Sequence, residues 1–225
     1  MKRHIPNIIT SLNLVAGSCG IIFILDKNFE LAIYMILLAA VLDFLDGTLA
    51  RLLNAYSDIG KSLDSLADLV SFGVLPGMLV YSVAGSSGKL PEWSPYMALL
   101  IPLLAGIRLA VFENDRRQKF SFRGLPVPAN ALFIASFSHV LLFSEGSFLN
   151  VGIFNYLVII VLISILQVIF IPMLSLKFSN YGIRENARKY ILLLGGLILV
   201  VTLGWEGIIM TFALYLLLSV VFARQ

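Results

Sequence analysis

Residues 43–68 read DFLDGTLARLLNAYSDIGKSLDSLAD, and this stretch decides how the rest of the chain is interpreted. It holds four aspartates, Asp43, Asp46, Asp64 and Asp68, within two segments that are otherwise apolar enough to lie in a membrane. A charged side chain at the centre of a bilayer costs about 2.5–3.5 kcal/mol on insertion scales. Four of them in one stretch therefore indicate a shared function.

Composition places the chain among integral membrane proteins. Of its 225 residues 59% are hydrophobic and only 13% are charged, and the mean hydropathy is +0.95. Soluble domains carry about 25% charged residues. The single cysteine, Cys19, excludes an internal disulfide and a cysteine-based zinc site. The net charge of +3 is unremarkable, and we expect no nucleic-acid partner.

The apolar segments predict an all-α, polytopic membrane protein with about eight transmembrane helices, since one span needs about 20 apolar residues. The first segment lacks a small-residue cleavage site, so we expect a retained helix rather than a signal peptide. The expected spans cover 8–25, 29–53, 59–84, 96–112, 127–143, 151–173, 187–203 and 207–222.

The basic residues indicate the orientation of these spans, because cytoplasmic loops collect Lys and Arg. With eight spans, all of the 16 Lys and Arg residues fall on the side of the N-terminus except Lys27, Lys89 and Arg108. We therefore expect a protein of the cytoplasmic (inner) membrane with both termini in the cytoplasm. The four aspartates then lie in the cytoplasmic halves of the second and third spans.

Helical geometry gathers these aspartates on two faces. Asp43 and Asp46 lie about 60° apart around a helix axis, and Asp64 and Asp68 about 40° apart. If the two faces meet, the carboxylates repel one another unless cations lie between them. Dense oxygen ligands suit Mg²⁺, Mn²⁺ or Ca²⁺, and two such ions about 3.5–4 Å apart suit an in-line phosphoryl displacement.

Small residues beside the acidic faces leave room for a bulky phosphorylated ligand. Gly47 and Ala50 let phosphate or ribose approach the backbone. Arg51 can bind phosphate oxygens with two parallel hydrogen bonds. Gly60 opens the third span, and Ser57 or the aspartate after it could cap this helix, whose N-terminus favours an anion.

The spacing of these residues matches a known pattern. The chain has D-x-x-D-G-x-x-A-R at 43–51 and G-x-x-x-D-x-x-x-D at 60–68. Together they resemble the complete signature of the CDP-alcohol phosphatidyltransferase family. The resemblance implies an enzyme that transfers a phosphatidyl group from a CDP-linked lipid to an alcohol and releases CMP.

The resemblance also implies residue roles and an assembly. The four aspartates would surround two divalent ions, Mg²⁺ or Mn²⁺, with Asp68 also the general base. Six spans in residues 1–182 would form the family core, residues 183–225 would add two helices, and the protein would be a homodimer. Contacts with the CDP-lipid are implied for Pro6, Asn7, Ile8, Ile9, Gly47, Ala50, Arg51, Ser57 and Gly60.

Other segments indicate the acceptor alcohol. Four segments look like the phosphatidylserine synthase branch of the family, which implies CDP-diacylglycerol and L-serine as substrates. They read IPNIITSLNLVAG, LADLVSFGVLPGML, FRGLPVPANA and LKFSNYG. RLAVFEND departs from that branch, because Val111 and Glu113 stand where it usually has a basic residue and an Asn. Glycerol phosphate and inositol phosphate therefore stay open as acceptors.

A serine site needs a cationic partner for the serine carboxylate. Arg108, near the cytoplasmic end of the fourth span, is the candidate, and the alternative is that it reaches lipid phosphate at the interface. Weaker candidates follow in the next loop, at Arg116, Arg117, Lys119 and Arg123.

A cation or proton transporter is the alternative from a different functional class. Transporters place ionisable residues near the bilayer midplane with access from both sides. Here the four aspartates lie toward one side, and the outer halves of their spans are apolar. A scaffold that only mediates assembly would leave the charges unexplained. The sequence therefore favours an enzyme.

Overall fold

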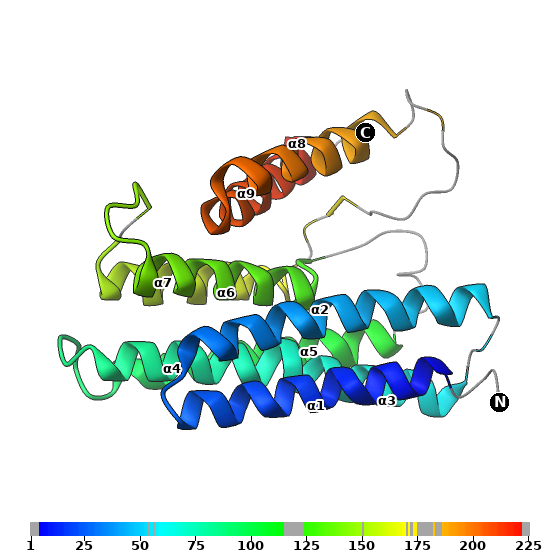
Figure 1. The fold of residues 1–225 in the computed structure, drawn as a ribbon, viewed down its shortest axis with the longest axis horizontal. Helices are drawn as coiled ribbons and strands as arrows, with labels where there is room; N and C mark the ends of the chain where they lie inside the picture. Colours follow the sequence, from blue (N-terminus) through cyan, green and yellow to red (C-terminus); the bar gives the residue numbers. More distant parts are fainter. Residues whose placement is uncertain are drawn as a thin grey trace.

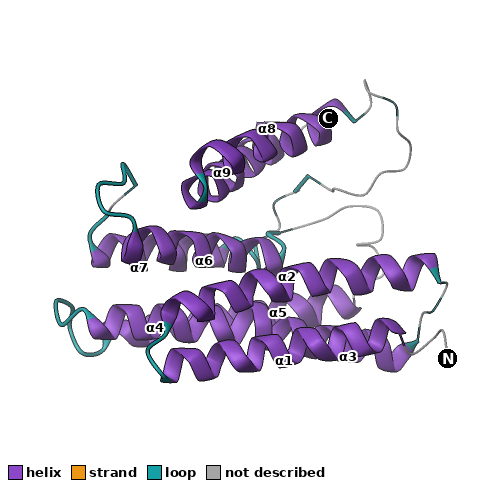
Figure 2. Cartoon of the chain, in the orientation of Figure 1, coloured by secondary structure: helices purple, strands orange, loops and turns teal. Residues whose placement is uncertain are grey.

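A computed structural model describes residues 5–53, 55, 57–114, 124–149, 151–169, 171, 173–174, 182 and 186–221. Within these residues the secondary structure is helical, without strands, as Figure 2 shows. This agrees with the expected all-α class.

The first two helices form an antiparallel hairpin at one side of the bundle (Figure 1). Helix α1 spans Ile5–Leu25 and α2 spans Phe29–Leu52. Between them Lys27 has a φ of 57°, and the Asn28 side chain caps α2 by accepting a hydrogen bond from the Leu31 N–H at 3.2 Å. The buried face of α1 includes several small or polar residues, which lets its neighbours approach closely.

The third span is continuous over Asp58–Ser86 but not a uniform α-helix. Helix α3 covers Asp58–Asp68, a π-helical segment covers Leu69–Val74, and α4 covers Leu75–Ser86. The π-helical segment ends two residues before Pro76, whose missing N–H removes an ordinary α-helical hydrogen bond. The sequence predicted the span but not its π-helical turn.

Helix α5 packs against this π-helical segment. A 3-10 helix, Ser94–Leu99, leads into α5, Leu100–Asn114. A Cβ placed on Gly73 would lie 3.1 Å from Cβ of Ala105, so the two backbones are close. The position of α5 is thereby fixed next to the chain that follows Asp68.

Two further helices form the next layer in Figure 1, α6 at Val127–Phe143 and α7 at Ile153–Ile165. The expectation of a helix over 151–173 is wrong beyond Ile165. There the chain turns and pairs with the residues just before α6. The Leu125 N–H donates to Leu166 O at 3.0 Å, and the Gly124 N–H donates to Ile171 O at 2.8 Å. These contacts replace the continuation of α7.

The last two helices, α8 at Ala187–Leu203 and α9 at Trp205–Val221, form a second hairpin. Gly204 makes the turn with a φ of 57°. Close packing follows from small residues, because a Cβ on Gly196 would lie 2.7 Å from Cγ2 of Thr211. Helix α9 packs on α6, where the rings of Phe212 and Phe133 lie 4.6 Å apart.

Length and composition agree with a polytopic membrane protein. Three described helical stretches are long and apolar enough to cross a membrane: Ile5–Leu25, Asp58–Ser86 and Ser94–Glu113. Shorter apolar helices are found at Val127–Phe143, Ile153–Ile165 and Trp205–Val220. Large apolar side chains point outward, such as Val201 at 76% exposure, as expected where lipid covers the surface.

Candidate functional site

Helices α2 and α3 bring three carboxylates together in the half of the bundle where α2 ends and α3 begins. Asp43 comes from α2, and Asp64 and Asp68 come from α3. One oxygen from each lies within 4.8 Å of the others, and all three residues are partly buried. The predicted meeting of the two acidic faces is therefore found for these three aspartates.

Asp46 is the fourth member and has a different environment. It is buried, and its Oδ2 accepts a hydrogen bond of 2.6 Å from the Thr10 hydroxyl of α1. Its charge still acts on each of the other three carboxylates. Asp46 thus lies beside the cluster, with one oxygen already engaged by α1.

These residues fit divalent cations. Three carboxylates that converge in partly buried positions repel one another unless positive charge lies between them. Oδ1 of Asp68 is buried and has no hydrogen-bond partner among the described residues, so this oxygen has the capacity to bind a ligand. The donor set is oxygen alone, as Mg²⁺, Mn²⁺ and Ca²⁺ prefer.

The small residues of the signature line an open space near the carboxylates. A Cβ added to Gly47 would meet nothing within 4 Å. Arg51, one helical turn further, donates from Nε to Gly47 O at 2.9 Å. Ala50 lies between them on α2 and is half-buried. This stretch of α2 therefore offers accessible backbone with a guanidinium beside it.

The N-terminus of α3 meets the first turn of α1. Ser57 caps α3, because its Oγ accepts a hydrogen bond of 3.0 Å from the Gly60 N–H, which confirms the expected cap. A Cβ on Gly60 would lie 2.7 Å from Oδ1 of Asn7. Pro6 is buried and Ile8 exposed in the same turn, and Ile9 is half-buried. The residues for which CDP-lipid contacts were predicted thus come from α1, α2 and the start of α3.

Arg108 is buried on α5, the helix that packs against the segment following Asp68. Its guanidinium lies over the Phe112 ring, 5.7 Å from the ring centre, and the phenol of Tyr215 from α9 is nearby. A buried guanidinium does not lie at the surface, where lipid phosphate would meet it. The burial of Arg108 therefore favours a role within the protein.

Glu113, where the sequence departs from the serine branch, contacts α3. Lys61 Nζ donates to the Glu113 backbone oxygen at 3.2 Å and lies 3.8 Å from its Oε1. The pair joins the end of α5 to the start of α3. The loop candidates Arg116, Arg117, Lys119 and Arg123, and nearly all of LKFSNYG, lie outside the described residues.

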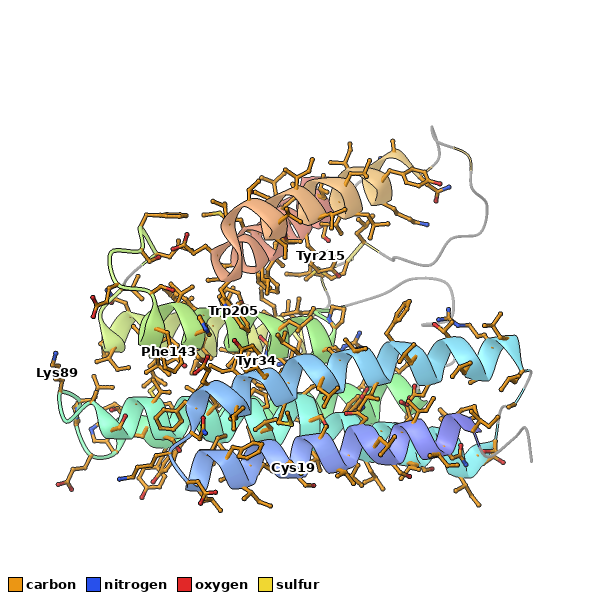
Figure 3. The ribbon with its side chains drawn as sticks, viewed as in Figure 1. Cys19, Tyr34, Lys89, Phe143, Trp205 and Tyr215 are labelled. Carbon is orange, nitrogen blue, oxygen red and sulfur yellow. The ribbon has the colours of Figure 1, made fainter. Side chains whose placement is uncertain are left out.

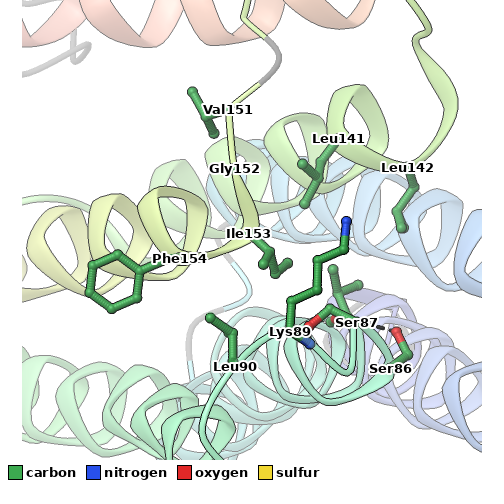
Figure 4. Close-up of a pocket in the computed structure, with 11 residues that line it drawn as sticks. Ser86, Ser87, Lys89, Leu90, Leu141, Leu142, Val151, Gly152, Ile153 and Phe154 are labelled. Carbon is green, nitrogen blue, oxygen red and sulfur yellow. Dashed lines mark hydrogen bonds between the residues drawn. The ribbon is translucent and has the colours of Figure 1, made fainter.

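A cavity of about 780 Å³ lies at the opposite end of the bundle, between the end of α4, the end of α6 and the start of α7 (Figures 1 and 4). Its lining is mainly apolar, with Lys89, Ser86 and Ser87 at one side. Because it is remote from the four aspartates, its size gives no information about the carboxylate cluster.

Sequence reasoning placed Pro6 to Ile9 of α1 at the site but missed two later residues of the same helix, Thr10 and Asn13. Thr10 and Asn13 are both buried, and each contacts or adjoins one of the aspartates. The available signal was their spacing, since polar residues three apart in an apolar span share a helix face.

Comparison with known proteins agrees with this geometry. The family model described as CDP-alcohol phosphatidyltransferase matches residues 3–223. The chain belongs to the CDP-alcohol phosphatidyltransferase family. Divalent-metal use is a property of CDP-alcohol phosphatidyltransferases, and the carboxylates of α2 and α3 offer a suitable donor set.

Several curated members of the CDP-alcohol phosphatidyltransferase family are similar to this chain. A CDP-diacylglycerol–serine O-phosphatidyltransferase of Helicobacter pylori (strain 26695) is 30% identical over 221 residues, 96% of this chain and 89% of the relative. One of Bacillus subtilis (strain 168) is 40% identical over 139 residues, 61% of this chain and 77% of the relative. An archaetidylserine synthase of Methanothermobacter thermautotrophicus is 34% identical over 145 residues, 64% of this chain and 61% of the relative.

Proposed function

We propose that this protein is a CDP-diacylglycerol–serine O-phosphatidyltransferase. It transfers the phosphatidyl group of CDP-diacylglycerol to the hydroxyl of L-serine, and it releases CMP. The observation that carries this assignment is the similarity to a serine transferase along 96% of the chain. The convergence of Asp43, Asp64 and Asp68 provides the acidic centre that the chemistry needs.

The acidic centre would hold two divalent ions, Mg²⁺ or Mn²⁺. Asp43, Asp64 and Asp68 supply converging oxygens, and Asp46 supplies the oxygen that Thr10 does not engage. When bound, such ions neutralise the negative charge of the pyrophosphate that is attacked.

Asp68 acts as the general base on the serine hydroxyl. Its carboxylate takes the hydroxyl proton while the serine oxygen forms a bond to the lipid-side phosphorus. The bond from that phosphorus to the bridging oxygen breaks, and its electron pair leaves with CMP. Positioning of the two substrates supplies much of the acceleration, as in phosphoryl transfer generally.

Binding groups on both sides of the cluster orient the substrates. Arg51 and the open backbone at Gly47 face the phosphates and ribose of the CDP-lipid, together with the capped start of α3. The guanidinium of Arg108 binds the serine carboxylate. A planar guanidinium suits this partner because it can donate two parallel hydrogen bonds.

The placement in the membrane follows from the substrates. The acyl chains stay in the bilayer while serine arrives from the cytosol, so we infer that the carboxylates face the cytoplasm, in the inner membrane, with both termini on that side. We also infer a homodimer whose family core is residues 1–182, with residues 183–225 as an addition.

A side-by-side acceptor assay tests the assignment. Purified protein receives CDP-diacylglycerol and Mn²⁺ or Mg²⁺ with L-serine, glycerol 3-phosphate or inositol phosphate, and the lipid product and CMP are measured. We expect phosphatidylserine and CMP with serine alone. Faster transfer to either phosphate would move the protein to another branch of the family, and no CMP release with any acceptor would refute the enzyme assignment.

A further inference from the structure

The buried face of α1 carries a polar side chain that the reaction described above does not use. Asn13 is fully buried, and within the described residues neither Oδ1 nor Nδ2 of its amide has a hydrogen-bond partner. Buried polar groups in folded proteins are nearly always hydrogen-bonded, because burial without a partner is unfavourable. Such an exception calls for an explanation, and a catalytic role is one that native structures provide.

The Asp68 carboxyl is the neighbour of this amide. The two side chains are close enough to interact, although not with the geometry of an ordinary hydrogen bond. Oδ1 of Asp68 is itself buried without a partner in the described part of the chain. A carboxylate only accepts hydrogen bonds and an amide nitrogen only donates them, so Nδ2 of Asn13 is the matching group.

The backbone of α1 at Asn13 is held against the π-helical segment that follows Asp68. The Ser71 hydroxyl donates to the backbone oxygen of Asn13 at 3.0 Å, in a buried position. One turn along α1, a Cβ on Gly17 would overlap Ser71, so α1 and the π-helical segment are in direct contact. Asn13 is thus held against the chain just after Asp68, and only side-chain movement is needed to join the two groups.

We propose that Asn13 is a positioning residue, which donates a hydrogen bond from Nδ2 to Asp68 in the substrate complex and so holds that carboxylate toward the serine hydroxyl. This inference rests on the proposed function. Catalytic hydrogen bonds commonly tighten only when the substrate is bound. A fixed donor also opposes the repulsion of Asp68 by the carboxylates of Asp43 and Asp64.

Three substitutions in the full-length protein separate this role from packing. Asn13→Ser keeps a donor, Asn13→Ala removes it, and Asn13→Asp keeps the shape but places a carboxylate against Asp68. For Asn13→Ala we expect kcat to fall about 10- to 100-fold, as when a partner of a catalytic or metal-binding group is removed, while KM for CDP-diacylglycerol changes little. The expected order of kcat is wild type, then serine, alanine and aspartate variants.

Ser18→Ala is the matched control, because Ser18 is an exposed polar residue of the same helix whose hydroxyl donates to Leu14 O at 2.9 Å. Its kcat should equal that of the wild type. Thermal unfolding in detergent shows which variants are folded, and if the alanine variant is not, the serine and aspartate variants still give the comparison. An aspartate variant as active as the wild type would show that only shape matters, and would refute the proposal. So would a change confined to KM for CDP-diacylglycerol.

Mn²⁺ binding without substrates gives a readout that does not depend on turnover. We expect the affinity of Asn13→Ala for Mn²⁺ to be about 10-fold lower, since the carboxylate is less well held. Unchanged Mn²⁺ affinity together with unchanged kcat would overturn the role of Asn13 alone. If instead the wild type transfers to no acceptor, the proposed function fails, and the Mn²⁺ comparison still decides whether Asn13 orders Asp68.

Discussion

Asp68 is the aspartate whose surroundings best suit a base. It is the one of the four with a buried oxygen that lacks a partner within the described residues, whereas Asp46 has an oxygen engaged by Thr10. Asp68→Asn keeps the shape but removes the proton acceptor. We expect kcat to fall about 10²- to 10⁴-fold, the usual contribution of general acid–base catalysis, with binding of CDP-diacylglycerol retained. Serine transfer and lipid binding measured on one preparation check this, and full turnover would exclude a base role.

The hydrogen bond from Thr10 to Asp46 is a second residue-scale test. Thr10→Val has nearly the same shape but no donor, and a hydrogen bond to a charged group contributes about 1.5–3 kcal/mol. We expect weaker Mn²⁺ binding and lower kcat, because the Asp46 carboxylate loses the group that orients it. Thr10→Ser keeps the hydroxyl and should bind Mn²⁺ like the wild type. Equal Mn²⁺ affinity in the valine variant would show that α1 does not orient Asp46.

Substitutions of Arg108 test the proposed binding site for the acceptor serine. Removing the guanidinium by Arg108→Ala should raise KM for serine more than KM for CDP-diacylglycerol, because in the proposed site only serine depends on it for charge neutralisation. Arg108→Lys keeps the charge without the two parallel donors, so an intermediate KM for serine is expected. Steady-state kinetics with each substrate varied in turn supply the measurement. A rise in KM for the CDP-lipid alone would place Arg108 on the lipid side instead.

At the scale of elements, the glycines of α1 and α2 have opposite roles. Gly17 is needed for packing, since a Cβ there would overlap Ser71, and overpacking commonly costs about 1–3 kcal/mol. Gly47 faces open space, where alanine would improve helix propensity by about 1 kcal/mol. We therefore expect Gly17→Ala to lower the unfolding temperature. Gly47→Ala should keep or raise it while increasing KM for CDP-diacylglycerol, and a destabilised Gly47→Ala with normal KM would contradict the assigned roles.

Local patterns predicted the helices better than the contacts between them. The expected bounds of the fifth and seventh spans coincide with α6 and α8, because runs of apolar residues end there at glycine, proline or polar residues. The predicted end of the span 151–173 was wrong, because the chain after α7 pairs with Gly124 and Leu125. Pairing between segments so far apart in the sequence depends on tertiary contacts. The aspartate cluster was predictable from helical spacing. The parts played by Thr10 and Asn13 were not, because they depend on how α1 packs against α2 and the π-helical segment.

At the scale of the whole molecule, α9 connects two regions of different character. At its start, the Trp205 ring stacks on His139 of α6 at 4.2 Å and lies 5.8 Å from the Tyr34 ring of α2 (Figure 3). Further along, Tyr215 is buried with its phenol near Arg108. The C-terminal hairpin is therefore anchored by aromatic packing at one end and adjoins the proposed serine site at the other.

This difference gives a paired test on one helix. Trp205→Ala removes two ring contacts, each contributing about 0.5–1.5 kcal/mol beyond burial, so the unfolding temperature should fall while KM for serine stays unchanged. Tyr215→Phe keeps the ring but removes the hydroxyl beside Arg108, so KM for serine should change with little loss of stability. Thermal unfolding and serine kinetics on both variants measure the two effects. If Tyr215→Phe leaves KM for serine unaltered, α9 only covers the core, because a helix that helps to shape the acceptor site must respond to its loss.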